Sequence, residues 1–145
     1  MRHSYLALLA SGGMWLMTNA QAADTPSIPG NIPMVLSYAV QPVHQFNQQL
    51  QQATQAQASW TASPETISQH YVGKGFELIN AQQRNGRVIT YNLRPQTDSH
   101  PQMLLILSID KYQRGWKVSK AGLSWRCHDE HFYSTNTCEL ATHQP

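Results

Sequence analysis

Two cysteines and two histidines near the C-terminal end of the chain are the residues best suited to chemistry. Cys127, His128, His131 and Cys138 form the pattern C-H-x-x-H-x6-C. Zinc accepts two thiolates and two imidazoles, but consecutive strand residues such as Cys127 and His128 point to opposite faces. Two cysteines in an oxidising compartment usually pair. We therefore predict a Cys127–Cys138 disulfide in preference to a metal site, and no cofactor.

The polar run from His128 to His131 also invites an acid–base interpretation. A general base needs a positioned substrate and a sheltered pocket that tunes its pKa. Four consecutive polar residues inside a disulfide loop are more typical of a solvated tip. The sequence has no G-x-S-x-G or H-E-x-x-H motif and no glycine-rich phosphate loop. We predict no catalytic residue and a protein that is not an enzyme.

Aromatic and basic residues suggest two other kinds of surface. A carbohydrate- or peptide-binding platform could use Trp60, Tyr71, Phe76, Tyr91, Tyr112, Trp116 and Trp125. Core packing is the favoured interpretation, because aromatic side chains at alternate strand positions usually pack inside. A small basic cluster surrounds one turn and consists of Lys111, Arg114, Lys117 and Lys120. We expect this cluster to be a solvated edge that discourages edge-to-edge pairing.

The composition bounds the class of protein. The chain has 145 residues, enough for one domain, with 10 Lys+Arg against 8 Asp+Glu and a net charge of +2. A nucleic-acid-binding protein would show a strong basic excess, so we predict no nucleic-acid partner. The hydrophobic fraction of 41% is enough to form a core.

The N-terminal segment has the features of a secretory signal peptide. Arg2 precedes an apolar run over Leu6–Met17, which is shorter than the about 20 residues that a membrane-spanning helix needs. Ala20-Gln21-Ala22 matches a small-x-small cleavage site, so we predict cleavage between Ala22 and Ala23. The expected product is periplasmic or secreted in a bacterial envelope, with no stable membrane span; a retained anchor is the alternative.

The mature chain begins with irregular and helical segments. Residues 23–41 form a Pro-rich leader, in which Met34–Val40 is apolar and could be a strand or the start of a helix. Pro42–Trp60 is predicted as a long amphipathic helix, since one stripe carries Val43, Phe46, Leu50, Ala53, Ala56 and Trp60. Ser63 is expected to cap a shorter helix that ends by Gly73.

The second half of the chain has the two-residue period of strands. Asn85-Gly86 predicts a tight hairpin turn between strands over Phe76–Gln83 and Arg87–Arg94. Gln102–Ile109 is expected to be a central strand buried on both faces. The last strand, or strand pair, covers Trp116–Ser119 and Leu123–Cys127, with a bend at Ala121-Gly122. The predicted fold class is α+β: a long N-terminal amphipathic helix on an antiparallel meander of about four strands, in one domain over residues 42–145.

The C-terminal half resembles the globular head of a type IV pilin. In that family a strand carrying Trp-x-Cys is followed by a loop and the second disulfide cysteine, as Trp125, Cys127 and Cys138 are here. The chain departs from the family at its start, where a signal peptide and a leader replace the long apolar helix of a pilin. The resemblance implies a soluble pilin-like head that does not polymerise, similar to TfpC-like exported accessory factors of the pilus.

Three functional hypotheses follow. The first is an exported accessory protein of type IV pilus assembly or stabilisation, which binds a pilus or envelope protein through a strand edge or a helix face. The second is a periplasmic inhibitor or immunity protein that blocks an enzyme. The third is a small exported hydrolase or metal-binding protein that uses His128 and His131 in the loop between the cysteines.

Overall fold

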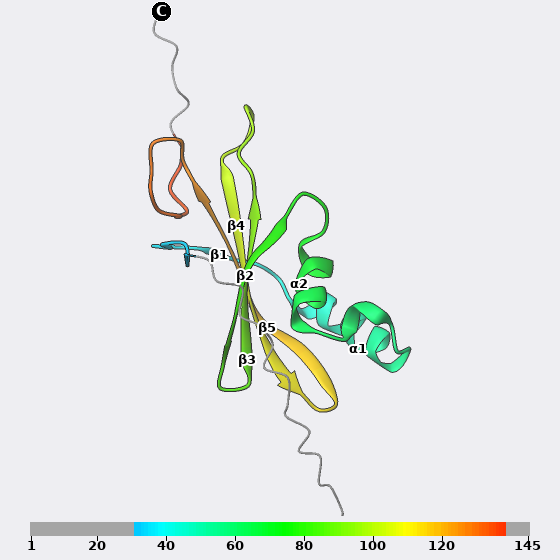
Figure 1. Ribbon diagram of the computed structural model, residues 1–145. Coiled ribbons are helices and arrows are strands. Elements are labelled where there is room, and N and C mark those ends of the chain that lie inside the picture. The colour runs from blue at the N-terminus through cyan, green and yellow to red at the C-terminus, as the bar shows by residue number, and fades with distance from the viewer. Residues whose placement is uncertain (1–30, 139–145) are drawn as a thin grey trace, which may run out of the picture.

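The computed structural model describes residues 31–138, which form a mostly β fold (Figure 1). The five strands form one antiparallel sheet in the order β1-β5-β4-β3-β2. In chain order the elements are β1 (Ala39–Val40), α1 (His44–Gln55), a 3-10 turn (Ser59–Thr61), α2 (Pro64–Val72), β2 (Glu77–Arg84), β3 (Arg87–Arg94), β4 (Gln102–Tyr112) and β5 (Gly115–Arg126). The predicted signal peptide and its cleavage site at Ala22 and Ala23 lie outside the described residues.

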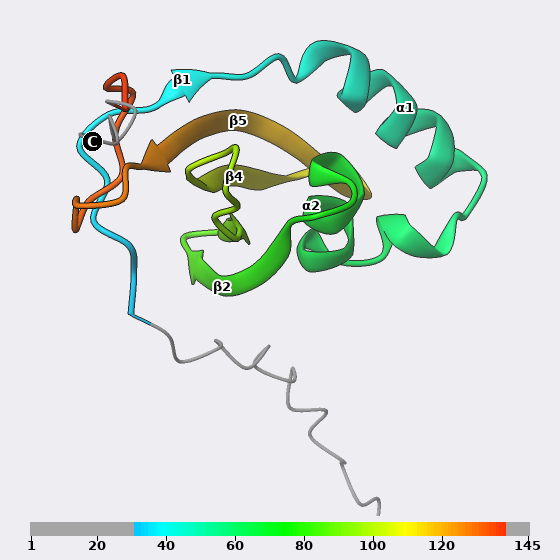
Figure 2. The ribbon, with the colours of Figure 1, turned by 90° about the horizontal axis from the view of Figure 1, so that it is seen from above.

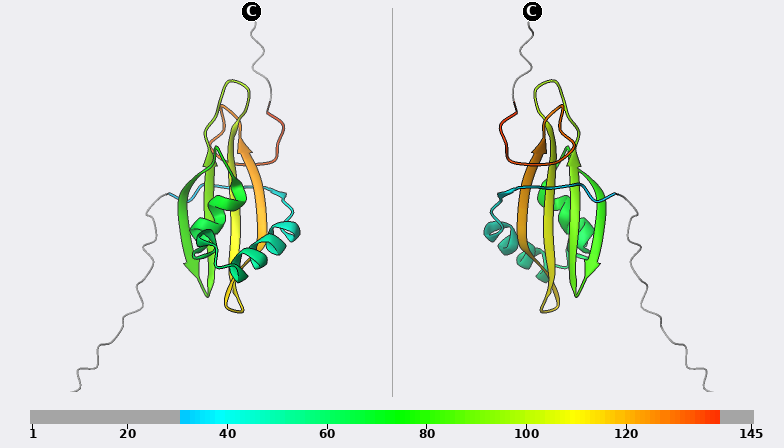
Figure 3. Two further views of the ribbon diagram at one scale, coloured as in Figure 1. Left: turned by 90° about the vertical axis from the view of Figure 1, so that its right-hand side faces the viewer. Right: turned by 90° about the vertical axis from the view of Figure 1, so that its left-hand side faces the viewer.

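The two faces of the sheet have different covers. Helices α1 and α2 lie on one face, while the chain before α1 crosses the opposite face (Figures 1 and 3). Seen along the strands, this N-terminal segment passes round the edge of the sheet beside β5 before it enters α1 (Figure 2). We call residues 32–40 the strap, and we call the chain after β5, residues 127–138, the tail.

The core under the helices is fully closed. Leu50 of α1 and Ile67 of α2 pack with Leu107, Ile109 and Val118 of the sheet, and each of these side chains has at most 1% of its surface exposed. A buried polar group also ties α2 to the sheet, because the Asn92 amide donates to Ser68 Oγ at 2.8 Å. Burial of this apolar set is the main contribution to the stability of the fold.

The predicted fold class, α+β with a long N-terminal helix on the sheet, is wrong. The structure is mostly β, with five strands and two short helices of 12 and 9 residues. The helix predicted over Pro42–Trp60 starts at His44 and ends at Gln55. Of the two alternatives left open for Met34–Val40, its last two residues form a strand, β1, which pairs with β5 through Ala39 and Val40.

A Schellman motif ends α1 early. Gln57 takes a left-handed conformation with φ of 56°, and its N–H donates to Thr54 O, while Ala58 N–H donates to Ala53 O. The apolar stripe nevertheless continues to Trp60, because the following turn returns this ring to the helix side. Its centroid lies 6.0 Å from that of Phe46. The apolar spacing in the sequence therefore continues to Trp60, although the helix itself ends at Gln55.

Other local predictions are confirmed. Ser63 caps α2 by accepting the Thr66 N–H at 3.3 Å, and the helix ends at Gly73 with φ of 70°. Asn85 and Gly86 have φ of 49° and 76°, as the hairpin between β2 and β3 requires. Strand β4 is central, between β3 and β5.

Two expectations about the last strands need correction. The last segments form one strand, β5, which is one of the two alternatives, but it continues through the expected bend at Ala121-Gly122, and its register with β4 shifts between Ser108 and Ile109. Strand β4 is not buried on both faces along its length, since Ile106 is only half-buried on the face that the strap crosses. The thin cover on that face is the physical reason.

Candidate functional site

The strap alternates between side chains that face the sheet and side chains that face outward. Val35 packs on the apolar cluster of the second face, which contains Tyr91, Leu104 and Tyr133. The residues at even positions from 32 to 40 are all exposed, while Pro33, Val35, Ser37 and Ala39 are half-buried. An extended chain gives this period of two, so the odd positions form the more buried side of the strap and the even positions form its exposed side.

The exposed side of the strap is an apolar row. The described residues include six exposed large hydrophobic side chains, and five of them belong to this row. We call these five the outer row: Ile32 (51% exposed), Met34 (65%), Leu36 (63%), Tyr38 (41%) and Val40 (73%). Apolar side chains scattered singly on a surface need no explanation, but a contiguous row marks an interaction site.

Backbone hydrogen bonds hold the strap to the tail and to β5. Leu36 N–H donates to Tyr133 O at 2.9 Å, and Tyr133 N–H donates to Met34 O at 2.8 Å. Farther along, Gln41 N–H donates to Ala121 O at 2.9 Å. The outer row is therefore presented on a backbone with fixed partners rather than on a loose loop.

A glycine of β5 makes room for one member of the outer row. A Cβ atom built on Gly122 would lie 2.7 Å from Cδ2 of Tyr38, closer than real Cβ atoms approach another heavy atom. The Tyr38 ring therefore rests directly on the β5 backbone. This contact fixes where the strap passes over the sheet edge. The sequence suggests a bend at Ala121-Gly122, whereas in the structure Gly122 lies within β5 and leaves room for the Tyr38 ring.

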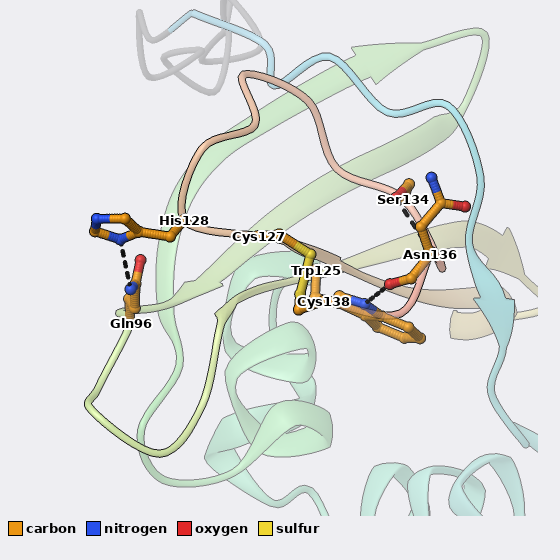
Figure 4. Close-up of a disulfide and its surroundings, with 7 residues drawn as sticks. All are labelled: Gln96, Trp125, Cys127, His128, Ser134, Asn136 and Cys138. Atoms are coloured by element: carbon orange, nitrogen blue, oxygen red, sulfur yellow. Dashed lines mark hydrogen bonds between the residues drawn. A yellow bond between two sulfur atoms is a disulfide. The ribbon is translucent and has the colours of Figure 1, made fainter. Parts of the chain in front are cut away.

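The disulfide predicted from the sequence is present and fastens the tail (Figure 4). Cys127 and Cys138 are joined with a Cα–Cα distance of 5.3 Å. The tail returns beside the end of β5, where Trp125 N–H donates to Ser134 O at 2.9 Å and Ser134 N–H donates to Trp125 O at 2.8 Å. The Trp125 indole donates to Asn136 O at 2.6 Å. The tail thus supports the strap, and the disulfide fits an oxidising compartment.

The histidines of the tail do not converge on a shared site. His128 is exposed, and its Nδ1 lies 3.1 Å from the Gln96 side-chain nitrogen (Figure 4). His131 is exposed as well. Both sulfurs are bonded to each other, so neither is a thiolate ligand. Within residues 31–138 no group of three or more His, Cys, Asp or Glu side chains could hold a metal ion.

Positive charge lies beside both ends of the strap's contact with the sheet. Lys120 Nζ is 4.7 Å from the centroid of the Tyr38 ring, and Arg126 Cζ is 5.7 Å from that of Tyr133. Burial raises the pKa of the Tyr133 hydroxyl, and the positive charge of Arg126 partly opposes this shift. The neutral Tyr133 hydroxyl donates to Gln102 Oε1 at 2.6 Å.

The structure separates the aromatic residues that the sequence suggested as a platform. Trp60, Tyr71, Phe76 and Trp116 pack against the core under the helices, whereas Tyr91 belongs to the opposite face. The favoured interpretation of core packing is therefore correct for most of the set. Tyr112 differs, since 49% of its surface is exposed at the hairpin between β4 and β5.

Two lysines of the basic cluster predicted around this hairpin make cation–π contacts with aromatic rings. Lys111 Nζ lies 4.3 Å from the Trp116 ring centroid, and Lys117 Nζ lies 5.3 Å from that of Tyr112. Such cation–π contacts are worth about 0.5–1 kcal/mol at exposed sites. The cluster is thus solvated, as expected, but it also positions the two rings.

The sequence analysis missed the outer row, although its signal is visible in the printed sequence. Apolar residues occupy every second position from Ile32 to Val40. The prolines at positions 26, 29 and 33 favour a linker, and Met34–Val40 taken alone is too short for its periodicity to separate a strand from a helix. The strap shows the alternating exposure of a strand over residues 32–40, but only Ala39–Val40 pair with a neighbouring strand as β1.

Comparisons with protein-family models, with curated proteins and with solved structures give no match for this chain. No helix of the described part of the chain is long and apolar enough to cross a membrane.

Proposed function

We propose that this protein is an exported, non-enzymatic accessory factor that binds a protein of the type IV pilus through the outer row of its strap. The observation that carries the proposal is the concentration of five of the six exposed large hydrophobic side chains of residues 31–138 on one side of one segment. Burying such a row against a partner would release about 25 cal/mol per Å² of apolar surface.

The choice of a protein partner follows from the shape and chemistry of the row. Its side chains stand at strand spacing on a backbone that is already fixed to the tail and β5. A partner would therefore lose little free energy in ordering this surface. Lys120 lies beside the Tyr38 ring and Arg126 beside the Tyr133 ring, so the matching partner has an apolar face with carboxylates at its rim.

The choice of the pilus rests on the resemblance carried by Trp125, Cys127 and Cys138. The long helix expected over Pro42–Trp60 is shortened to His44–Gln55 in the structure, so the tail element alone supports the pilus assignment. The disulfide supports a location in the periplasm or outside the cell. Removal of the predicted signal peptide would leave the strap close to the new N-terminus.

The proposal is tested by replacing two members of the outer row in the cells that make the protein. Deletion is expected to reduce surface pili, and the unchanged gene is expected to restore them. A variant with Met34→Ser and Leu36→Ser should fail to restore pili, because both side chains are more than half exposed and contribute to binding rather than to the core. Its binding to purified pili should weaken at least about tenfold, or about 1.4 kcal/mol.

The matched control replaces two exposed residues of α1, Gln45→Ser and Gln52→Ser, and should restore pili fully. Circular dichroism of both variants after export should be unchanged. Full piliation with the strap variant would overturn the assignment of the outer row. A deletion that leaves pili intact but poisons the cell would favour an inhibitor or immunity protein. Loss of function in a folded His128→Ala, His131→Ala variant would favour an enzyme or a metal-binding protein.

A further inference from the structure

A concave surface lies on the side of the molecule that carries the helices. A cleft of about 850 Å³ runs between α1 and the hairpin that joins β4 to β5. Gln48, Gln51 and Gln55 line its helical wall, and Tyr112, Arg114 and Lys117 line its hairpin wall. We call this surface the hairpin cleft. It shares no residue with the strap.

The two walls of the hairpin cleft are held at a fixed spacing. The Asn47 side chain of α1 pairs with the backbone of Val118 in β5, donating to its O at 2.8 Å and accepting its N–H at 2.9 Å. At the other end, a Cβ atom on Gly115 would come within 3.2 Å of Thr54 Cγ2, so glycine allows the helix to approach the hairpin closely. The cleft is therefore preformed, as small-ligand sites usually are.

The chemistry of the walls is unusual for a peptide groove. Apart from the methyl group of Thr54, no aliphatic side chain lines the cleft among the described residues, and its apolar surface comes from the rings of Tyr112 and Trp116. It offers amides instead, and each Gln amide both donates and accepts hydrogen bonds. A sugar ring presents vicinal hydroxyls that need both kinds of partner. Its C–H face matches an exposed aromatic ring such as Tyr112.

The charge of the hairpin cleft has one sign. Arg114 and Lys117 line it, while no carboxylate lines it within residues 31–138. A planar guanidinium binds a carboxylate through two parallel hydrogen bonds. Lys117 already lies over the Tyr112 ring, so a carboxylate that pairs with this ammonium would sit beside the ring on which a sugar could stack.

We propose that the hairpin cleft binds an acidic oligosaccharide, one whose sugar rings carry carboxylates. The amides bind the hydroxyls, Tyr112 packs against a ring face, and Arg114 and Lys117 bind the carboxylates. This is a second activity beside the binding of a protein through the strap, and it does not depend on that proposal.

Calorimetric titration of the purified full-length mature chain with an oligomer of galacturonic acid tests the inference. We expect saturable 1:1 binding that weakens as salt is added, since exposed charges are screened. A neutral cello-oligosaccharide of the same length should bind about tenfold more weakly, because it lacks the charge-assisted bonds. Arg114→Ala should produce a similar loss, about tenfold, for the acidic oligomer alone.

A pair of neighbouring substitutions on α1 gives the matched control. Gln51 lines the cleft and Gln52 does not, although both are exposed. Gln51→Glu should weaken binding about tenfold by placing a like charge beside the ligand, whereas Gln52→Glu should change it by less than about twofold. The strap variant Met34→Ser, Leu36→Ser should bind the oligomer as the unchanged protein does.

Three results would overturn the inference. One is the absence of binding to the acidic oligomer at millimolar concentration. Another is equal affinity for the neutral oligosaccharide, which would remove the role of charge. A third is equal or tighter binding of hexaglutamate with the same loss in Arg114→Ala, which would make the cleft a site for acidic peptides.

Discussion

The two faces of the sheet are covered by different elements: two helices lie on one face, and the extended strap and tail lie on the other. On one face, α1 and α2 bring their own apolar side chains, and Leu50 and Ile67 are buried to 1% and 0% exposure. On the other face, the strap and tail bring Val35 and Tyr133 toward the sheet and leave the outer row exposed. The first cover is complete, and the second is a single layer of extended chain.

The difference shows which apolar side chains are buried within this chain and which remain exposed. Under the helices, apolar residues meet apolar residues on both sides, which is the close packing of a protein interior. On the strap, side chains at odd positions such as Val35 pack toward the sheet, whereas the apolar side chains of the outer row remain exposed to solvent. A further layer of protein over the outer row would complete the second face in the way that the helices complete the first.

Adjacent residues of β4 offer the largest and most direct test of this comparison. Leu107 is fully buried under the helices, and Ile106 is half-buried under the strap. Leu107→Ala should lower the free energy of unfolding by about 3–4 kcal/mol, because it leaves a cavity that rigid packing cannot fill. Ile106→Ala should cost about 1–2 kcal/mol less than that. Urea unfolding followed by circular dichroism measures both values.

Equal losses for the two β4 variants would show that the strap seals its face as tightly as the helices do. The comparison between the faces would then fail. Leu107→Ile, which keeps the volume of the side chain, is the control for the cavity and should cost less than about 1.5 kcal/mol.

The disulfide provides the second test, because it fastens only the thin cover. A variant with Cys127→Ser and Cys138→Ser should lose about 2.5–3 kcal/mol of stability, as expected for closing a loop of 11 residues in the unfolded chain. Hydrogen exchange should show the asymmetry between the faces. The amides of Leu36 and Ser134 should exchange faster, while exchange in the core under the helices should track global stability.

An increase at Leu36 and Ser134 that is no larger than the increase in the core under the helices would contradict this picture. The unchanged protein treated with reductant is the control, since it opens the same bond without changing a residue. It should exchange at the same amides as the double variant.

How far the sequence predicted this fold depended on how local each signal was. The Ser63 cap and the Asn85-Gly86 turn act through their own backbone and neighbouring groups, and both predictions were confirmed. The extent of α1 was not predicted, because Gln57 adopts a left-handed conformation that glycine or asparagine usually signals. Trp60 kept the apolar period without remaining in the helix.

The candidate site was less predictable than the fold, since tertiary contacts create it. The disulfide followed from the number of cysteines and from the expected export of the chain. The outer row did not, because its meaning depends on Val35 packing inward and on Tyr133 pairing with the strap, 98 residues farther along the chain. Neither partner is visible from the local pattern. The hairpin cleft likewise requires α1 and β5 to meet through Asn47 and Val118.

The smallest expected effect concerns the stability contributed by an ion pair on the same face as the strap, whose two side chains are partly exposed to solvent. Arg87 donates two hydrogen bonds to Asp110, at 2.6 and 3.1 Å, across the β3–β4 ladder. These bonds hold the pKa of Asp110 below its usual value, against a smaller opposing effect of burial. A pKa that is lowered in the folded state stabilises the fold above about pH 4, the ordinary aspartate value, and this stabilisation disappears as pH falls through the folded pKa.

Asp110→Asn should therefore lower the melting temperature slightly at neutral pH, and the gap to the unchanged protein should close in strong acid. The effect should be well below those of Leu107→Ala and of the disulfide variant, because exposed ion pairs contribute little. Asp98→Asn removes the same charge from an exposed loop and should give no such closing gap. A gap that persists at low pH would show that Asp110 acts through packing. This part of the strap face would then be stabilised by side-chain packing, as the core under the helices is, rather than by an exposed ion pair.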